Sequence, residues 1–335
     1  MRLIALMTTL ILALLLTAPI PVSGDPLAHT YSIVARDPKT GEMGAAVQSH
    51  WFPAATDVLW VEAGVGAVAT QSFVDPRYGL RGLELLRQGK LAPDVLRQLV
   101  EADPGRDTRQ VAMVDSQGHV ATHTGTGCIE AAGHQAGNQY SVQANLMANG
   151  RVWSAMAVAY EKTTGDLADR MLAALDAAQA VGGDIRGQQS AAIIVVRATS
   201  SGRPWVGADR LFDVRVHDHP APLTELRRLV RLQRAYNQMN AGDELLAARK
   251  VDEALQQYTK SVELAPEIPE LAFWQAVTLV SIGRESDALP IFKTVFAREP
   301  FWVELLPRLR AAKQLPDDAA LIERIQAQAT PPPAH

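Results

Sequence analysis

The chain lacks most of the features that would define its fold or its partners directly. Among 335 residues it has one cysteine, Cys128, so an intrachain disulfide is excluded and folding must depend on buried cores. Neither sign of charge prevails, because 32 Lys and Arg residues oppose 36 Asp and Glu residues, and no nucleic-acid partner is expected. The hydrophobic content of 47% excludes a disordered chain, and the length suggests about two domains.

Long apolar runs are also missing, except at the start of the sequence. Arg2 precedes an apolar run over 3–16, and the small residues Val22 and Gly24 follow it, which is the pattern of a secretory signal. This run of about 14 residues is shorter than the roughly 20 that a spanning helix needs. We therefore expect a signal peptide at 1–24, a mature chain that starts at Asp25, a periplasmic or extracellular location, and no membrane span after processing.

Residues 25–222 mix strand and helix signals. The segment 64–70 is small and apolar on both alternating faces, so its strand must be covered on both sides. Because strands and helices alternate in clusters, we expect an α+β domain in which sheets pack on each other with helices outside. The predicted strands are 30–36, 44–51, 58–62, 66–72, 110–114, 119–123, 190–197 and 211–216, and the predicted helices are 78–88, 93–101, 152–161 and 166–180.

Residues 223–330 read as almost purely helical, with a frayed tail at 331–335. Similar residues recur at the 34-residue spacing of tetratricopeptide repeats, and a long helix at 223–239 together with the segments 301–313 and 318–327 would cap the two repeats. We expect this all-α module to dock a protein partner or a second copy of the chain. The pairs at this spacing are Ala254 and Ala288, Tyr258 and Phe292, and Pro266 and Pro300.

No strong catalytic signature is present. The sequence has no glycine-rich phosphate loop with its Lys, no His-Glu-x-x-His motif and no nucleophile elbow, so neither a cofactor nor a metal is expected. His217 and His219 suit a solvated or capping role better than zinc binding. Cys128, between His123 and His134, leaves thiol or metal chemistry as a weaker alternative to a small buried residue.

Eight blocks of sequence carry a resemblance to a known family. They occur in order over nearly all of 29–222, and they resemble the bacterial domain-of-unknown-function family 1028. The resemblance implies a fold similar to that of N-terminal-nucleophile hydrolases, a four-layer αββα sandwich, and any activity follows from this fold analogy alone. The blocks are 29–37, 64–71, 103–106, 123–125, 132–134, 143–145, 183–190 and 216–220.

That fold class requires a Thr, Ser or Cys at the first position of its first strand, where the residue's own α-amino group serves as base. Here Thr30 opens the first strand, but Asp25 to His29 would precede it after signal removal. Three alternatives follow. Thr30 cuts the His29–Thr30 bond itself, another peptidase trims the five residues, or the amine stays blocked and the fold is silent.

The remaining site residues are polar side chains that interrupt apolar segments, because such groups are costly to bury unless they are used. With Thr30, the predicted catalytic residues are Asn145, as an oxyanion donor, and Asp184 and Arg186, which pair with each other or with a charged substrate group. The leading hypothesis is an exported amidohydrolase that cuts a linear or cyclic amide of a small molecule or peptide. Its rival is a non-catalytic ligand-binding domain. The predicted substrate-binding residues are Ser49, His50, Thr70, Gln71, His123 and Ser190.

Overall fold

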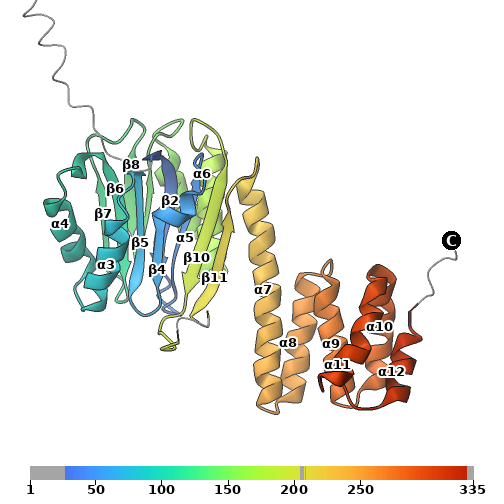
Figure 1. Ribbon diagram of the computed structural model, residues 1–335. Helices are drawn as coiled ribbons and strands as arrows, with labels where there is room; N and C mark the ends of the chain where they lie inside the picture. The colour runs from blue at the N-terminus through green and yellow to red at the C-terminus, as the bar shows by residue number, and fades with distance from the viewer. Residues whose placement is uncertain (1–26, 204–206, 208, 330–335) are drawn as a thin grey trace, which may run out of the picture.

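The structure, a computed structural model, describes residues 27–203, 207 and 209–329. The expected signal peptide at 1–24 and tail at 331–335 lie outside the described residues. Two antiparallel sheets face each other, helices cover both outer faces, and a helical region follows the sheets along the chain (Figure 1). The prediction of a mixed α+β domain with antiparallel sheets and a C-terminal helical region is confirmed.

The first sheet has the strand order β1-β5-β6-β7, and β4 also pairs with β5. Its outer face packs against α3 and α4 through a core that includes Val68, Tyr78 and Met113. Small residues in β5 allow cover on both sides, as the sequence predicts. The elements are β1 (Leu27–Ala28), β4 (Leu59–Glu62), β5 (Gly66–Phe73), α3 (Arg77–Arg87), α4 (Ala92–Ala102), β6 (Arg109–Asp115) and β7 (Val120–Thr124).

The second sheet has the order β11-β10-β3-β2-β9-β8, and α5 and α6 cover its outer face. Two of its strands, β8 and β9, are absent from the prediction. Glycine and polar residues in and between them resemble a loop, and pairing with β2 and with each other overrides that local signal. The elements are β2 (Thr30–Arg36), β3 (Met43–Ser49), β8 (Gly133–Gly137), β9 (Tyr140–Ala144), α5 (Val152–Lys162), α6 (Leu167–Ala180), β10 (Ser190–Val196) and β11 (Arg210–Val216).

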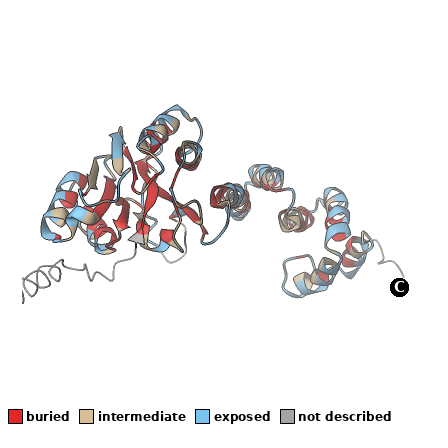
Figure 2. Ribbon diagram, turned by 90° about the horizontal axis from the view of Figure 1, so that it is seen from above, coloured by how far each residue is buried: buried red, intermediate tan, exposed pale blue. Residues whose placement is uncertain are grey.

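The two sheets enclose a core that is apolar along most of its length. Strand alternation places Val34, Val47 and Ala69 in this inter-sheet core, and Figure 2 shows buried residues running through both sheets. The short helix α2 (Ala54–Val58) joins β3 to β4, and η1 (Arg106–Thr108) joins α4 to β6. At the end where β2 begins, the enclosed side chains become polar, and this change marks the candidate site described below.

The helical region is joined to the sandwich by its first and longest helix. Helix α7 runs eight residues further than the predicted end at 239 and packs beside β11, where Asn237 donates to the Leu211 carbonyl (2.9 Å). Arg234 of α7 also pairs with Asp166, the N-cap of α6, and with Asp169 in the first turn of that helix. The elements are α7 (Pro222–Ala247), α8 (Val251–Leu264), α9 (Pro269–Ser281), α10 (Glu285–Arg298), η3 (Pro300–Glu304), α11 (Leu305–Ala311) and α12 (Ala319–Gln326).

The residues 34 positions apart occupy matching places in α8 and α10. Ala254 and Ala288 are fully buried, and the rings of Tyr258 and Phe292 are buried one turn further along each helix. Before α10, Gly283 has a φ of 81°, a left-handed conformation that glycine adopts readily. Before α8, Arg249 adopts the same left-handed conformation, with a φ of 62°. Within the described residues no helix is both long enough and apolar enough to span a membrane.

Candidate active site at the start of strand β2

Thr30 is the first residue of β2 and is fully buried. The sheet register places it directly opposite Ser49 of β3, which in turn lies opposite Ser190 of β10. The Thr30 hydroxyl lies 2.9 Å from the Ala28 carbonyl oxygen and 3.0 Å from Ser49 Oγ, so its single proton has two alternative acceptors. The hydroxyl is therefore held between the chain that precedes it and the neighbouring strand.

The carbonyl group of His29, immediately before Thr30, accepts two hydrogen bonds. Ser49 Oγ donates to it at 2.7 Å, and Arg186 Nη2 donates to it at 2.7 Å. Donors aimed at a carbonyl oxygen in a buried place stabilise negative charge that develops on that oxygen. The peptide bond between His29 and Thr30 is thus polarised by a hydroxyl and a guanidinium at once.

Asp184 fixes the orientation of Arg186. Its carboxylate is fully buried and accepts from Arg186 Nε (3.0 Å) and Nη2 (2.7 Å), a two-point pairing that sets the plane of the guanidinium. It also accepts from the backbone N–H groups of Arg186 (2.9 Å) and His50 (3.3 Å). The structure therefore brings together the predicted residues Thr30, Asp184 and Arg186, with Asp184 as the positioning residue.

The imidazole of His29 lies in a closed pocket. Its Nδ1 is 2.8 Å from Asn145 Oδ1, and its ring is perpendicular to that of Phe73, with 6.2 Å between the centroids. The Asn145 amide nitrogen donates to Gln110 Oε1 (2.9 Å), which leaves the Asn145 oxygen facing His29. Because an amide oxygen can only accept, His29 Nδ1 is the donor in its bond to Asn145. In this chain Asn145 binds the His29 side chain, and only its backbone N–H reaches Thr30, at the Thr30 carbonyl (3.1 Å).

The docking of His29 is expected to depend on pH. Burial is the main cause that lowers the pKa of His29 below 6.5; Arg186 adds to it, while Asn145 and Asp184 oppose it. Because the folded-state pKa is lowered, burial of the His29 ring contributes its full stability above pH 6.5. This contribution is lost progressively as the pH falls from 6.5 through the lowered pKa, because the ring must then be protonated.

Hydrogen exchange of the Thr30→Ala chain, which lacks the hydroxyl next to the His29 carbonyl, would measure this effect at residues 27–29. We expect faster exchange at pH 5 than at pH 7, after correction for the intrinsic rate. His29→Gln keeps an N–H donor without a titrating ring, so its corrected exchange should not change over this interval. An equal acceleration in both chains would show that another group is responsible.

A chain of buried amides lies behind the site. Gln71 donates to the Thr30 carbonyl (3.1 Å) and to Gln110 Oε1 (2.7 Å), and Ser32 donates to Gln71 Oε1 (2.6 Å). Gln143 continues it with a bond to Ser32 Oγ (2.7 Å). Sequence reasoning named Gln71 but missed Ser32, Gln110 and Gln143. Their signal was alternation: Ser32 and Gln110 share a strand face with apolar residues of the inter-sheet core, and Gln143 alternates with apolar residues that face the helices.

Other predicted residues lie outside this group. Thr70 is on the opposite face of β5 from Gln71 and donates to the Asp75 carbonyl (3.4 Å). His123 shares that outer side and bonds to the Arg106 carbonyl (2.8 Å). Ser190 is on the same face as Ser49, but its hydroxyl donates to the Trp51 carbonyl (2.6 Å). Thr70 and His123 therefore do not meet Thr30, because their strands direct them to the helix layer.

Cys128 does not have the surroundings of a reactive thiol. Its Sγ donates to the Arg109 carbonyl (3.3 Å), and burial raises the pKa of the thiol, which disfavours the thiolate. The exposed His134 bonds through Nδ1 to Thr124 Oγ1 (2.9 Å). Throughout the described part of the chain, no three His, Cys, Asp or Glu side chains gather as a metal site would require.

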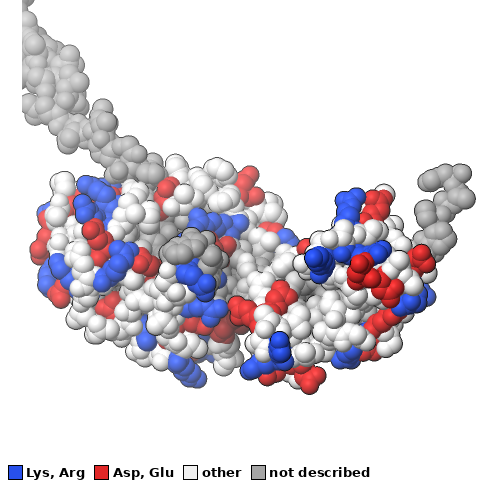
Figure 3. Space-filling model, turned by 60° about the horizontal axis from the view of Figure 1, so that its bottom comes forward, with Lys and Arg blue, Asp and Glu red and all other residues white. Residues whose placement is uncertain are grey.

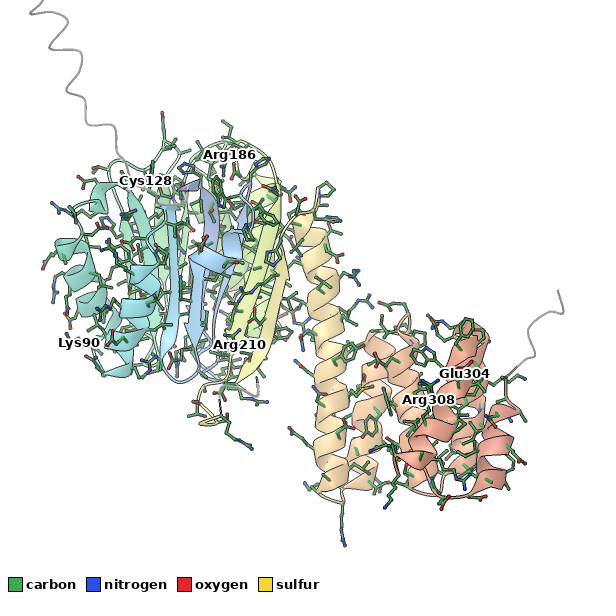
Figure 4. The ribbon with its side chains drawn as sticks, viewed as in Figure 1. Lys90, Cys128, Arg186, Arg210, Glu304 and Arg308 are labelled. Carbon is green, nitrogen blue, oxygen red and sulfur yellow. The ribbon has the colours of Figure 1, made fainter. Side chains whose placement is uncertain are left out.

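The candidate site lies at one end of the sandwich, and the loops there carry exposed apolar side chains. Figure 4 shows Arg186 and Cys128 at this end, with Lys90 and Arg210 at the other. Ile185 is 62% exposed beside Arg186, and Ile129 is joined to it through the backbone of Leu146, which bonds to both. On the face drawn in Figure 3, basic and acidic side chains are interspersed over the sandwich and the helical region, without a broad patch of one sign.

The fold and the site define a class of protein: a two-sheet α+β domain with a buried threonine at the start of a central strand. In this chain a helical region follows that domain. The chain belongs to the family of unknown function DUF1028, whose sequence pattern matches residues 30–226. A crystal structure of a DUF1028 protein from Silicibacter pomeroyi is similar, with 28% identity and a TM-score of 0.54 over 60% of this chain and 84% of that one. None of the curated proteins compared with the chain matches it.

Proposed function

We propose that this protein is an exported amidohydrolase whose nucleophile is Thr30, released as the N-terminal residue by cleavage of the His29–Thr30 bond. The observation that carries the proposal is the His29 carbonyl, which accepts from Ser49 and Arg186 while the hydroxyl of the next residue stands beside it. The family match supports it, because the matched region begins at Thr30 itself.

The cleavage begins with attack of Thr30 Oγ on the His29 carbonyl carbon, which closes a five-membered ring. The proton of Thr30 passes to Ser49 Oγ, while Ser49 gives its own proton to the carbonyl oxygen, whose charge Arg186 also offsets. The C–N bond then breaks as the carbonyl re-forms, the proton on its oxygen passes to the nitrogen, which becomes the Thr30 α-amine, and the His29 acyl group is left as an ester on Thr30. One water molecule hydrolyses the ester to the His29 carboxylic acid and a free Thr30 hydroxyl.

The same groups then serve an external amide. The freed α-amino group of Thr30, with a pKa of about 8, accepts the hydroxyl proton when Thr30 attacks a substrate carbonyl. Ser49 and Arg186 donate to the substrate oxygen in place of the His29 carbonyl, and Asp184 holds Arg186 in plane. The leaving amine takes the proton from the α-ammonium group, and water hydrolyses the acyl-enzyme.

We also infer the finer architecture that accompanies this activity. Two facing antiparallel sheets between helix pairs support a four-layer sandwich similar to that of N-terminal-nucleophile hydrolases. The matched burial of Ala254 with Ala288 and of Tyr258 with Phe292 supports a tetratricopeptide-type module at 223–330. In this proposal the module docks a protein partner or a second copy of the chain, and the signal at 1–24 exports the protein.

A second candidate function is a non-catalytic ligand-binding domain. The observation that favours it is the complete burial of Thr30, whose hydroxyl bonds to the Ala28 carbonyl and is closed to substrates while residues 27–29 remain. The two candidates differ in the fate of this segment, which cleavage removes and a binding domain keeps.

The mass of the exported protein decides between them. Mass spectrometry of the denatured, secreted chain is expected to show a mature N-terminus at Thr30. A chain that begins at Asp25 and keeps that mass on incubation would rule out the nucleophile. Trimming by another peptidase is separated from self-cleavage by purifying the uncut chain and following its mass in the absence of other proteins.

A further inference from the structure

The segment before Thr30 lies in the sandwich as an added strand. β1 pairs in antiparallel fashion with β5, Leu27 opposite Phe73 and Ala28 opposite Ser72. On the same edge of β5, β4 covers only Gly66–Ala69. Residues 27–28 therefore occupy a backbone edge that cleavage would leave open, and an open strand edge binds extended peptides by main-chain hydrogen bonds.

Each position of the segment meets a different surface. The side chain of Ala28 is fully enclosed in the inter-sheet core, where there is no room for a larger group. His29 is 4% exposed, donates from Nδ1 to Asn145 Oδ1 (2.8 Å) and packs against the perpendicular ring of Phe73. The His29 carbonyl reaches the two donors Ser49 and Arg186.

This arrangement has the form of an acyl chain bound at a nucleophile. β5 provides a backbone partner, and the inter-sheet core provides an enclosed place for a small side chain. Asn145 provides a hydrogen-bond acceptor for the side chain at the scissile bond, and Ser49 and Arg186 donate to the scissile carbonyl. In the precursor the occupant of this path is the chain's own residues 27–29, so the groove vacated by them is shaped to their chemistry.

We propose that the groove vacated by residues 27–29 binds extended peptides that carry histidine, or a side chain of similar size with an N–H donor, at the scissile bond and a small residue before it. This inference rests on the proposed function, and it names the substrate as a peptide rather than a cyclic or small-molecule amide. Asn145 is the residue that determines specificity for the histidine, and the buried surroundings of Ala28 limit the preceding residue.

The test uses the secreted protein with synthetic peptides whose sequence is that of residues 25–29. Binding of Asp-Pro-Leu-Ala-His, with a free carboxylate, is measured by calorimetry, and cleavage is measured with its p-nitroanilide. Matched peptides replace His with Leu or Ala with Trp. We expect each replacement to lower affinity and kcat/KM by about 10-fold or more, because one loses a buried hydrogen bond and the other overfills a closed pocket.

A variant of the specificity residue separates recognition from a general loss of activity. In Asn145→Ala the ratio of kcat/KM for the His and Leu peptides should fall towards one. Asn145→Asp keeps an oxygen acceptor at that place and should keep the preference. If Asn145→Ala fails to fold, the comparison of Asn145→Asp with the unaltered chain still tests the role of the acceptor.

The outcomes distinguish this inference from the proposed function. Hydrolysis of all three peptides at equal rates would leave the hydrolase in place and overturn the peptide groove. Selective binding without any hydrolysis would support the groove and overturn the proposed activity. Absence of both binding and hydrolysis, or a mature chain that retains 25–29 in the groove, would overturn the inference.

Discussion

Replacing Thr30 with alanine is expected to abolish cleavage of the His29–Thr30 bond and turnover of any amide substrate, a loss on the order of 10³-fold or more. The methyl side chain of Ala leaves no nucleophile, while the donors on the His29 carbonyl remain in place. The secreted variant should therefore keep Asp25 as its first residue. Intact-mass measurement and a p-nitroanilide assay report the two losses separately.

Two further variants show whether such a loss is chemical or structural. Thr30→Ser keeps the hydroxyl and should still be cleaved. Thr70→Ala removes another fully buried threonine hydroxyl from the sandwich, on the outer face of β5, and should be cleaved at the normal rate. If Thr30→Ala is cleaved as fast as the unaltered chain, another peptidase removes the segment. Similar thermal midpoints for the variants would exclude unfolding as the cause.

The sequence was sufficient to predict the elements whose hydrophobic pattern is local. The buried-type strand 66–72 and the helices at 152–161 and 166–180 recur in the structure within a few residues as β5, α5 and α6. β8 was missed because Gly133 and Gly137 weaken its strand signal, and β9 was missed because its pairing partner β2 lies about a hundred residues away. Long-range pairing of this kind leaves no mark in a short window of sequence.

The candidate site could be predicted only in part, for the same reason. Thr30, Asp184 and Arg186 stand out locally, as the start of a strand and as charges in a glycine-rich loop. The two hydrogen bonds to the His29 carbonyl could not be predicted in this way. The bond from Ser49 depends on the register of β2 and β3, and the bond from Arg186 depends on a loop far along the chain. Sequence reasoning treated His29 only as one of the residues before Thr30. Its hydrogen bond to Asn145 depends on the pairing of β2 with β9.

Loss of the Ser49 hydroxyl is the second large effect that the geometry predicts. Ser49→Ala removes one of the two donors on the His29 carbonyl and the acceptor for the Thr30 proton. Removing a single oxyanion donor typically slows a reaction by about 10²- to 10³-fold, so cleavage should be slowed by this amount rather than abolished. Pulse labelling of the exported chain, followed by intact-mass analysis over time, measures the rate.

Ser49 gives a cleaner test than Arg186, because loss of Arg186 would leave the fully buried Asp184 carboxylate without its charged partner and destabilise the fold. The sheet itself offers the matched control. Ser190 lies directly opposite Ser49 on the next strand and is equally buried, yet its hydroxyl donates to Trp51 and not to the scissile carbonyl. Ser190→Ala should therefore change the cleavage rate by no more than a few-fold. Equal slowing in both variants would mean that packing at this end of the sheet, and not the hydrogen bond to His29, controls the reaction.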